Sequence, residues 1–372
     1  MRFPLLVSCC CVLSFVSFSL PMASANAPDA ARLQALDERT AELPRVHAVV
    51  VAHDGEIVHE IHQGGPGVAA PANVKSLSKT VLAAITGAAI EAGVIDSVDQ
   101  PLASLLNSLP SDADPRVNDI TVAHLLAQQA GLERTSGSHY GAWVASANWV
   151  NDALSRPFVD APGGRMLYST GTSHLLSAAL THASGESTLA LAQRLLGEPL
   201  NITIPAWPRD PQGIYFGGND MLLSPRALVE IGELYRNDGV VNGQRVLPEG
   251  WVEASWTARG SSPWTGDGYG YGWFISRIGG REVRYGWGYG GQMIYVFPGR
   301  APVAIAMTSD PDQPSARTGY RTQLHALAGP LVARGYSVLV ARAPRAMIDL
   351  NRHERELDPV MVTGLPRDQP LQ

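Results

Sequence analysis

Cysteine is almost missing from this chain. Its three cysteines are consecutive, at residues 9–11, within an N-terminal segment that has the character of a leader. Once that segment is removed, the chain has no thiol, which excludes disulfide bonds and a cysteine nucleophile. The sequence also lacks a cluster of basic residues interleaved with aromatic side chains, and its acidic residues outnumber its basic residues by 34 to 28. Because such a cluster is needed to follow a phosphate backbone, we expect no nucleic-acid partner.

Two common hydrolase signatures are absent as well. The zinc motif His-Glu-x-x-His does not occur, and His59 and His62 stand three residues apart in a strand-like segment, which would place them on opposite faces. We therefore predict no metal, and we expect no other cofactor. The segment closest to the Gly-x-Ser-x-Gly motif of α/β-hydrolases is Gly171–Leu175, which lacks the second glycine.

The N-terminal segment has the features of a secretory signal peptide. An uncharged run extends from Phe3 to Pro28, and its apolar core, Leu5–Leu20, is short for a membrane span. Small residues at Ala23 and Ala25 form a signal-peptidase pattern. We predict cleavage after Ala25 and an exported protein, periplasmic or secreted, with no stable membrane insertion afterwards. An uncleaved membrane anchor and a lipoprotein site at Cys9 are the alternatives.

Strand-like patterns occur near both ends of the chain, with helical patterns between them. Arg45–Gly65 alternates apolar and polar residues on both sides of the turn dipeptide Asp54-Gly55, which predicts a β-hairpin. Leu77–Ala92 is apolar on nearly every face, as expected for a buried helix. From Gly268 onward, short apolar segments separated by glycines predict an antiparallel meander.

These patterns predict an α+β fold in which an antiparallel sheet is flanked by helices. The N-terminal hairpin and the C-terminal meander would form the sheet, a mainly helical domain would be inserted between them, and a last helix would cover about residues 313–334. The predicted parts are a signal peptide at 1–25, a sheet domain at 26–75 and 266–345, a helical domain at 76–265 and a polar tail at 346–372. We expect the substrate cleft between the sheet and the helical domain.

The two lysines of the chain stand close together. All of the 28 basic residues except Lys75 and Lys79 are arginines, and these two flank Ser76 in the segment NVKSLSKT. Near the start of a helix, residues three apart project from one face, so Ser76 and Lys79 would meet. A lysine whose pKa is lowered by burial accepts a proton from a serine hydroxyl, whereas an arginine stays protonated. We predict Ser76 as a nucleophile and Lys79 as its partner, although Ser-x-x-Lys alone is short enough to arise by chance.

Two other segments complete a plausible site. Tyr168 follows a Pro-Gly-Gly turn and precedes an apolar helix. A tyrosine beside a lysine shares one proton with it, so either Lys79 or Tyr168 is the formal base. The glycine-rich segment Tyr285–Gly299 leaves its backbone open to a substrate carbonyl, and amides there would stabilise an oxyanion together with the amide of Ser76. Taken singly, Tyr168 also fits a core tyrosine, and glycine-rich strands also occur at bends.

The order of these motifs resembles the serine β-lactamase and penicillin-binding-protein superfamily. The likeness is closer to its class C-like branch, which includes esterases and the 6-aminohexanoate-dimer hydrolase, and it extends from about Ala30 to Pro330. It implies a β-lactamase/transpeptidase-like fold. It also implies Ser76 as the acylated nucleophile, Lys79 as its proton partner, and Tyr168 as general base and then acid.

The resemblance also implies a second oxyanion donor and reveals two departures. The donor would be the amide of Tyr289, which follows Gly288, although the register of this strand could slip by one or two residues. Thr170 stands where the β-lactamases of this superfamily have the asparagine of Tyr-x-Asn, and Gly286 stands where they have the lysine of Lys-Thr-Gly. Those side chains orient the substrate amide and attract its carboxylate, and losing such a contact costs about 1.5–3 kcal/mol.

Several neighbouring residues are candidates for the walls of an acyl pocket. These pocket candidates are Trp287, Gly288, Thr170, Tyr140 and Trp143. Lys75, beside the nucleophile, is predicted to support the site without acting as a catalyst.

The sequence therefore predicts an exported serine hydrolase of the Ser-Lys-Tyr type. It would cleave an ester or amide bond of a small-molecule substrate through an acyl-enzyme on Ser76. One alternative is a β-lactamase or DD-carboxypeptidase that acts on penicillins or peptidoglycan peptides. Another is a catalytically weak, penicillin-binding-like sensory module. Nothing in the sequence separates an ester from an amide substrate or indicates an oligomeric state.

Overall fold

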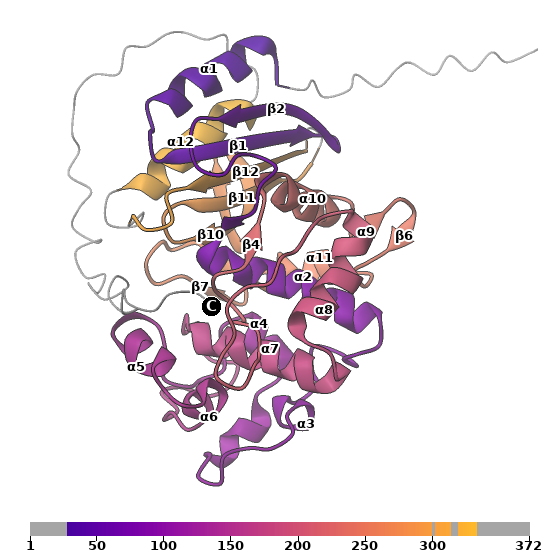
Figure 1. Ribbon diagram of the computed structural model, residues 1–372, viewed down its shortest axis with the longest axis vertical. Coiled ribbons are helices and arrows are strands. Elements are labelled where there is room, and N and C mark those ends of the chain that lie inside the picture. The colour runs from indigo at the N-terminus through magenta and orange to yellow at the C-terminus, as the bar shows by residue number, and fades with distance from the viewer. Residues whose placement is uncertain (1–27, 300–301, 314–318, 333–372) are drawn as a thin grey trace, which may run out of the picture.

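A single antiparallel sheet of eight strands organises the protein. The computed structural model describes residues 28–299, 302–313 and 319–332, so the predicted signal peptide and C-terminal tail lie outside the described residues. The strands follow the order β2-β1-β12-β11-β10-β9-β8-β7. Most of the helices lie below this sheet in Figure 1. The predicted α+β fold, with an antiparallel sheet and flanking helices, is confirmed.

The predicted N-terminal hairpin consists of β1 (Val46–His53) and β2 (Glu56–His62). Its turn residues, Asp54 and Gly55, have φ angles of 52° and 88°, as a tight two-residue hairpin turn requires. Strand β1 pairs on its other side with β12 (Val303–Ser309), which lies about 250 residues later in the chain. The first and last strands are thus neighbours in the sheet.

The predicted C-terminal meander is also present, and its strands are neighbours in chain order. The final connection, from β11 to β12, includes residues 300–301, which are outside the described residues. Strand β7 joins the sheet before residue 266, where we placed the domain boundary, and that boundary stays a prediction. The strands are β7 (Gly260–Ser261), β8 (Gly268–Tyr269), β9 (Phe274–Ile278), β10 (Arg281–Gly288), β11 (Gln292–Phe297) and β12.

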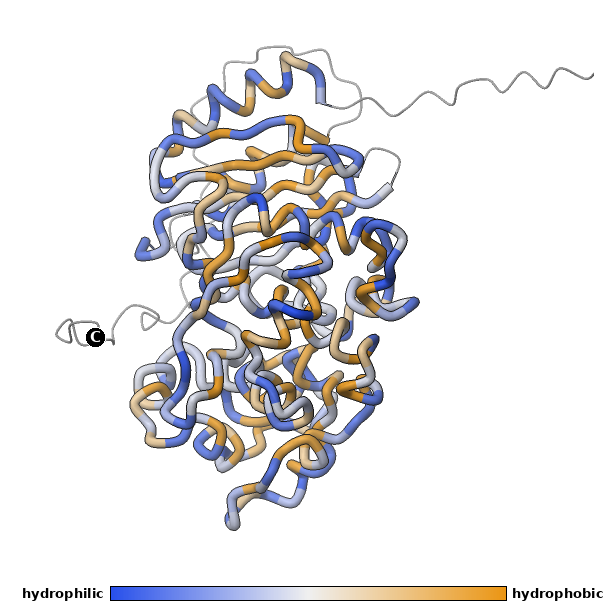
Figure 2. The backbone as a smooth tube through the Cα atoms, turned by 45° about the vertical axis from the view of Figure 1, so that its right-hand side comes forward, coloured by the Kyte–Doolittle hydropathy of each residue, from blue (hydrophilic) through white to orange (hydrophobic). Residues whose placement is uncertain are grey.

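Alternate residues of the central strands enter two separate hydrophobic cores. On β11, Tyr295 faces the core beneath α1 (Ala30–Ala41) and α12 (Tyr320–Val332), whereas Ile294 faces the core that contains the helical part. Figure 2 shows these strands as largely hydrophobic, while α1 alternates between hydrophobic and hydrophilic residues. The sheet is therefore buried on both faces, and the second face carries the helices that hold the site.

Helix α2 (Ser78–Glu91) runs below the sheet and is buried on nearly all sides, as predicted for residues 77–92. A 3-10 turn, η1 (Lys75–Leu77), precedes it, so Ser76 lies in this turn and the α-helix begins two residues later. Helix α7 (Thr170–Ser184) packs against α2 and carries Thr170 at its first position. None of the described helices is both long and apolar enough to cross a membrane.

Apart from α10, which has 12 residues, the other elements are short. The helices and helical turns are α3 (Leu102–Leu105), η2 (Pro115–Asp119), α4 (Val122–Leu126), η3 (Gly137–His139), α5 (Tyr140–Val144), α6 (Trp149–Leu154), α8 (Thr188–Ala192), η4 (Gln193–Gly197), α9 (Glu198–Leu200), α10 (Pro225–Arg236) and α11 (Trp251–Ser255). Two small ribbons pair β3 (Ala72–Asn73) with β4 (Leu222–Leu223), and β5 (Val240–Val241) with β6 (Gln244–Arg245). The first ribbon holds the chain just before η1.

Candidate active site

The predicted nucleophile and its lysine lie together at the start of α2. Lys75 has a φ of 50°, and its backbone N–H donates to Oδ1 of Asn73 at 2.9 Å. This left-handed residue turns the chain sharply into η1, so that Ser76 precedes the first α-helical turn. Lys79 follows one turn later, and its Nζ lies 3.2 Å from Oγ of Ser76.

Lys79 is buried among neutral oxygen atoms. Its residue surface is 4% exposed, and its Nζ lies 2.7 Å from the carbonyl oxygen of Gly218 and 3.5 Å from Oγ1 of Thr170. Burial lowers the pKa of Lys79 to about 7, and the carboxylate of Asp220 opposes this shift. A neutral amine has two N–H groups and one lone pair. In the protonated form Nζ donates to Oγ of Ser76. In the neutral form the carbonyl and the threonine hydroxyl can accept the two N–H groups, and the lone pair is then left for the hydroxyl of Ser76.

Tyr168 lies against the same pair and stands two residues before the start of α7. Its ring centroid lies 4.7 Å from Nζ of Lys79, and its phenol is close enough to the side chain of Ser76 for the two groups to interact. Burial raises the pKa of Tyr168 to about 12, and the nearby side chain of Ser76 opposes this shift. The phenol therefore keeps its proton at neutral pH. The structure thus brings Ser76, Lys79 and Tyr168 together from segments 92 residues apart in the sequence.

The start of α7 is fixed by hydroxyl groups from a distant loop. Oγ of Ser136 accepts from the backbone N–H of Thr170 at 2.9 Å, and Oγ1 of Thr135 accepts from that of Gly171 at 2.7 Å. The N-cap residue, Ser169, makes no side-chain bond to the first helical turn, so these two hydroxyls take its place. They hold Thr170, a predicted pocket residue, where its hydroxyl reaches Lys79.

The glycine-rich strand β10 lies directly against η1. A side chain at Gly288 would collide with the carbonyl oxygen of Val74, and one at Gly286 would collide with Leu77 and Thr80. The two glycines therefore let this strand end approach the turn that holds Ser76. Tyr289, whose amide is a predicted oxyanion donor, comes next in the hairpin turn, which is closed by Gly291 N–H and Gly288 C=O at 3.1 Å. A lysine side chain at position 286 would have no room here.

The predicted aromatic pocket residues lie in different surroundings. Tyr140 is half-buried at the edge of the site, where its hydroxyl accepts from Nδ2 of Asn219 at 3.0 Å. Trp287 is half-buried on the face of β10 opposite Gly286 and Gly288, with Cζ of Arg321 located 5.5 Å from its ring centroid.

Trp143 does not line a pocket, so that prediction is wrong. The residue is fully buried, and its ring packs against those of Trp149, His174 and Phe216. Its Nε1 donates to the carbonyl oxygen of Trp149 at 3.0 Å, which satisfies its polar group inside the core. Trp143 therefore stabilises the core of the helical part and does not line the site.

A loop that was not predicted from the sequence completes the surroundings of both lysines. Gly218, Asn219 and Asp220 follow one another in the segment FGGND, and Gly218 has a φ of 143°. Oδ1 of Asp220 lies 3.3 Å from Nζ of Lys75, so Lys75 forms an ion pair at the site, and its supporting role stays a prediction. Two adjacent glycines followed by an amide and an acid signal an unusual loop, but no local pattern relates this loop to Ser76.

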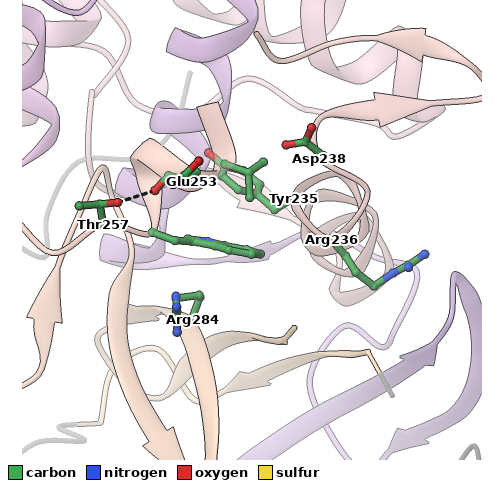
Figure 3. A pocket seen from close by; sticks show the side chains of 8 residues that line it. Tyr235, Arg236, Asp238, Glu253, Thr257 and Arg284 are labelled. Atoms are coloured by element: carbon green, nitrogen blue, oxygen red, sulfur yellow. Dashed lines mark hydrogen bonds between the residues drawn. The ribbon is translucent and has the colours of Figure 1, made fainter. Parts of the chain in front are cut away.

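A separate groove of about 480 Å³ lies where the end of α10 meets α11 and β10 (Figure 3). None of the three predicted catalytic side chains lines it. Its lining residues are Tyr235, Arg236, Asp238, Val252, Glu253, Trp256, Thr257 and Arg284. This groove is distinct from the site around Ser76.

Comparisons with known proteins identify related folds and one family. No curated protein sequence matches this chain. A protein from Bacillus anthracis assigned as a 6-aminohexanoate-dimer hydrolase superimposes with a TM-score of 0.64 at 19% identity, covering 79% of each chain. The hydrolase EstCE1, which has promiscuous acyltransferase activity, gives 0.62 at 17% identity, covering 81% of this chain and 98% of its own.

An octameric penicillin-binding protein homologue from Pyrococcus abyssi gives a TM-score of 0.60 at 20% identity, covering 81% of this chain and 78% of its own. At such identities these structures establish a shared fold. The Beta-lactamase family model matches residues 41–329, which is most of the chain. With a Ser-x-x-Lys pair at the start of α2 and a tyrosine against it, this protein belongs to the Beta-lactamase family, whose members are serine hydrolases.

Proposed function

We propose that this protein is a serine hydrolase of the Ser-Lys-Tyr type that cleaves an ester or amide bond of a small molecule through an acyl-enzyme on Ser76. The observation that carries the proposal is the buried amine of Lys79, whose pKa is lowered to about 7, at 3.2 Å from Oγ of Ser76. Its two other contacts accept N–H groups, so its lone pair is directed at the nucleophile.

Acylation begins when Oγ of Ser76 attacks the substrate carbonyl carbon and Lys79 takes the hydroxyl proton. The amides of Ser76 and Tyr289 stabilise the negative charge that develops on the carbonyl oxygen. The bond to the leaving group then breaks, and the hydroxyl of Tyr168 protonates the departing atom. Lys79, now an ammonium, returns a proton to the phenolate, so the proton balance closes with an ester on Ser76.

Deacylation uses the same groups in reverse. A water molecule attacks the acyl carbon and loses a proton towards Tyr168 and Lys79, and the regenerated serine oxygen takes that proton back. The raised pKa of Tyr168, about 12, supports an assignment in which Lys79 is the proton acceptor and Tyr168 is the proton donor at neutral pH. This assignment differs from the base-then-acid role that the family resemblance implies for Tyr168.

The surroundings of Gly286 support a substrate without a carboxylate at that position. Leu77 and Thr80 fill the direction in which a side chain would point, and no lysine stands there to attract an anion. The same departure argues against efficient recognition of penicillins or D-Ala-D-Ala peptides. The character of residues 1–25 supports export, so we place the reaction in the periplasm or outside the cell.

Covalent labelling tests the proposal. Mass spectrometry after treatment with a fluorophosphonate, or with a slowly released ester, is expected to find the adduct on the peptide that holds Ser76. Ser76→Ala is expected to lose both the adduct and the turnover of p-nitrophenyl esters, while nitrocefin is expected to be a poor substrate of the wild type. Unchanged ester turnover in Ser76→Ala, or an adduct on another serine, would refute the acyl-enzyme.

A further inference from the structure

Two side chains, Trp264 and Arg134, extend outward from the predicted catalytic residue Tyr168. The ring centroid of Trp264 lies 5.7 Å from that of Tyr168, in an edge-on arrangement. Cζ of Arg134 lies 5.8 Å from the ring centroid of Trp264. Trp264 is 37% exposed, which is unusual among the described aromatic side chains, so one of its surfaces is open to a ligand.

The backbone independently places Arg134 at the site. The next residue, Thr135, donates its backbone N–H to Oγ of Ser169 at 3.0 Å, and Ser136 contacts Thr170. Thr170 in turn contacts Lys79. Arg134 therefore lies on the loop that fixes the start of α7, in the helical part of the protein, whereas Gly286 lies on the sheet.

The guanidinium of Arg134 has no anionic partner among the described residues. This guanidinium lies over the ring of Trp264, and no carboxylate of the described residues forms an ion pair with it. The adjacent Glu133 is engaged elsewhere, at 3.2 Å from NH1 of Arg156 and 3.9 Å from Nδ1 of His139. Arg134 thus keeps its hydrogen-bond donors available beside a half-exposed aromatic surface.

We propose that Arg134 and Trp264 form a subsite for an anionic group, such as a carboxylate, at the far end of the substrate. The apolar part of the substrate lies along the indole of Trp264, and the anion is held by the guanidinium of Arg134. This inference rests on the proposed function, because it assigns a substrate class to the same site. It places recognition of the substrate's charge on the helical side of Ser76. On the sheet side, Gly286 has no side chain that could attract an anion.

Paired substrates test the subsite through a ratio. The substrates are p-nitrophenyl hydrogen adipate and suberate, each compared with its neutral methyl ester, and the readout is kcat/KM for the acid divided by kcat/KM for the methyl ester. In Arg134→Gln this ratio is expected to fall about tenfold from the wild-type value, since a charge-assisted contact is lost. Because Trp264 separates Tyr168 from Arg134, the suberate pair is expected to show the larger fall.

Two further variants separate a specific contact from general electrostatics. Arg134→Lys keeps the charge and is expected to retain most of the ratio. Arg209, whose Cζ lies 5.4 Å from the ring of Tyr215, is an exposed arginine stacked on an aromatic ring with no ion pair among the described residues. Arg209→Gln is therefore a matched control and is expected to leave the ratio at its wild-type value.

The possible outcomes distinguish this inference from the proposed function. Equal ratios in the wild type and Arg134→Gln, or an equal fall in Arg209→Gln, would overturn the subsite. If Ser76-dependent turnover of the neutral esters persists in that case, the hydrolase assignment stands. If neither substrate of a pair is cleaved, or Ser76→Ala cleaves both at the wild-type rate, the proposed function itself fails and the subsite fails with it.

Discussion

Lys75 and Lys79 are one helical turn apart, yet their surroundings differ in kind. The side chain of Lys75 is 23% exposed, and its Nζ lies 3.3 Å from the carboxylate of Asp220. Lys79 is 4% exposed, and the three oxygen atoms that its Nζ contacts are neutral. A carboxylate partner favours the charged amine, whereas burial against neutral acceptors favours the uncharged amine. The comparison teaches that tertiary surroundings, rather than residue type, make one lysine an ion-pair partner and the other a proton acceptor.

Replacing each lysine by arginine is the strongest test of the difference between Lys75 and Lys79. Lys79→Arg keeps the positive charge but removes the basicity, so we expect kcat/KM to fall by about 10³-fold or more, nearly as far as in Lys79→Ala. Lys75→Arg keeps an ion pair with Asp220 and is expected to lose less than about tenfold. Steady-state kinetics with a p-nitrophenyl ester measures both, and wild-type rates in Lys79→Arg would remove Lys79 from the chemistry.

Gly218 offers a test of the neutral surroundings of Lys79. A Cβ at this position would lie 2.6 Å from Cβ of Ser173 and 3.3 Å from Cγ of Lys79, and the backbone has a φ of 143°. We expect Gly218→Ala to displace the amine or its carbonyl acceptor and to lower kcat about a hundredfold. Gly213→Ala is the control, because Gly213 also has a positive φ, 86°, but no atom lies within 4 Å of the added methyl group. Similar losses in both variants would attribute the effect to backbone strain.

The pH profile measures which group accepts the proton. With the pKa of Lys79 lowered to about 7, the reactive neutral amine predominates above pH 7. The rate is expected to rise with pH, to reach a plateau above about pH 8, and to be about tenfold below the plateau at pH 6. A phenolate base at Tyr168, whose pKa is about 12, would instead give a rate that still rises above pH 10. The logarithm of kcat/KM against pH decides between the two.

Substitutions at Lys75 and at Asp220 should shift that pH profile in opposite directions. Theirs is the smallest of the four predicted effects. The carboxylate of Asp220 raises the pKa of Lys79, so Asp220→Asn is expected to move the acid limb to lower pH. Lys75→Met removes the cation that offsets this carboxylate, so the acid limb should move to higher pH. Shifts of about half a pH unit are expected, which correspond to about a threefold change in rate at pH 6. Shifts in the same direction would contradict the electrostatic explanation.

The elements that could be predicted are those defined by neighbouring residues. The hairpin around Asp54 and Gly55, the meander from Gly268 and the buried helix after Leu77 all depend on periodicity within a few residues. The proximity of Ser76 and Lys79 belongs to the same class, because residues three apart near a helix start meet on one face.

The pocket residues could not be predicted in this way. Trp143 and Tyr140 are three residues apart in one short helix, yet Trp143 is in the core and Tyr140 is at the edge of the site. Nothing in their local sequence separates them, because the difference depends on packing against Trp149 and Phe216. Burial of an aromatic side chain is decided by which distant elements cover it.

By itself, the sequence determined the thiol-free character of the chain after residue 25 and the adjacency of a serine and a lysine on one turn. The tertiary structure decided that Lys79 is buried, that its amine donates a hydrogen bond to the carbonyl of Gly218, 139 residues away, and that Arg134 lies beside Trp264. The physical reason is that helical geometry acts over three or four residues. The pKa of an amine, in contrast, depends on desolvation and charges brought together from the whole chain.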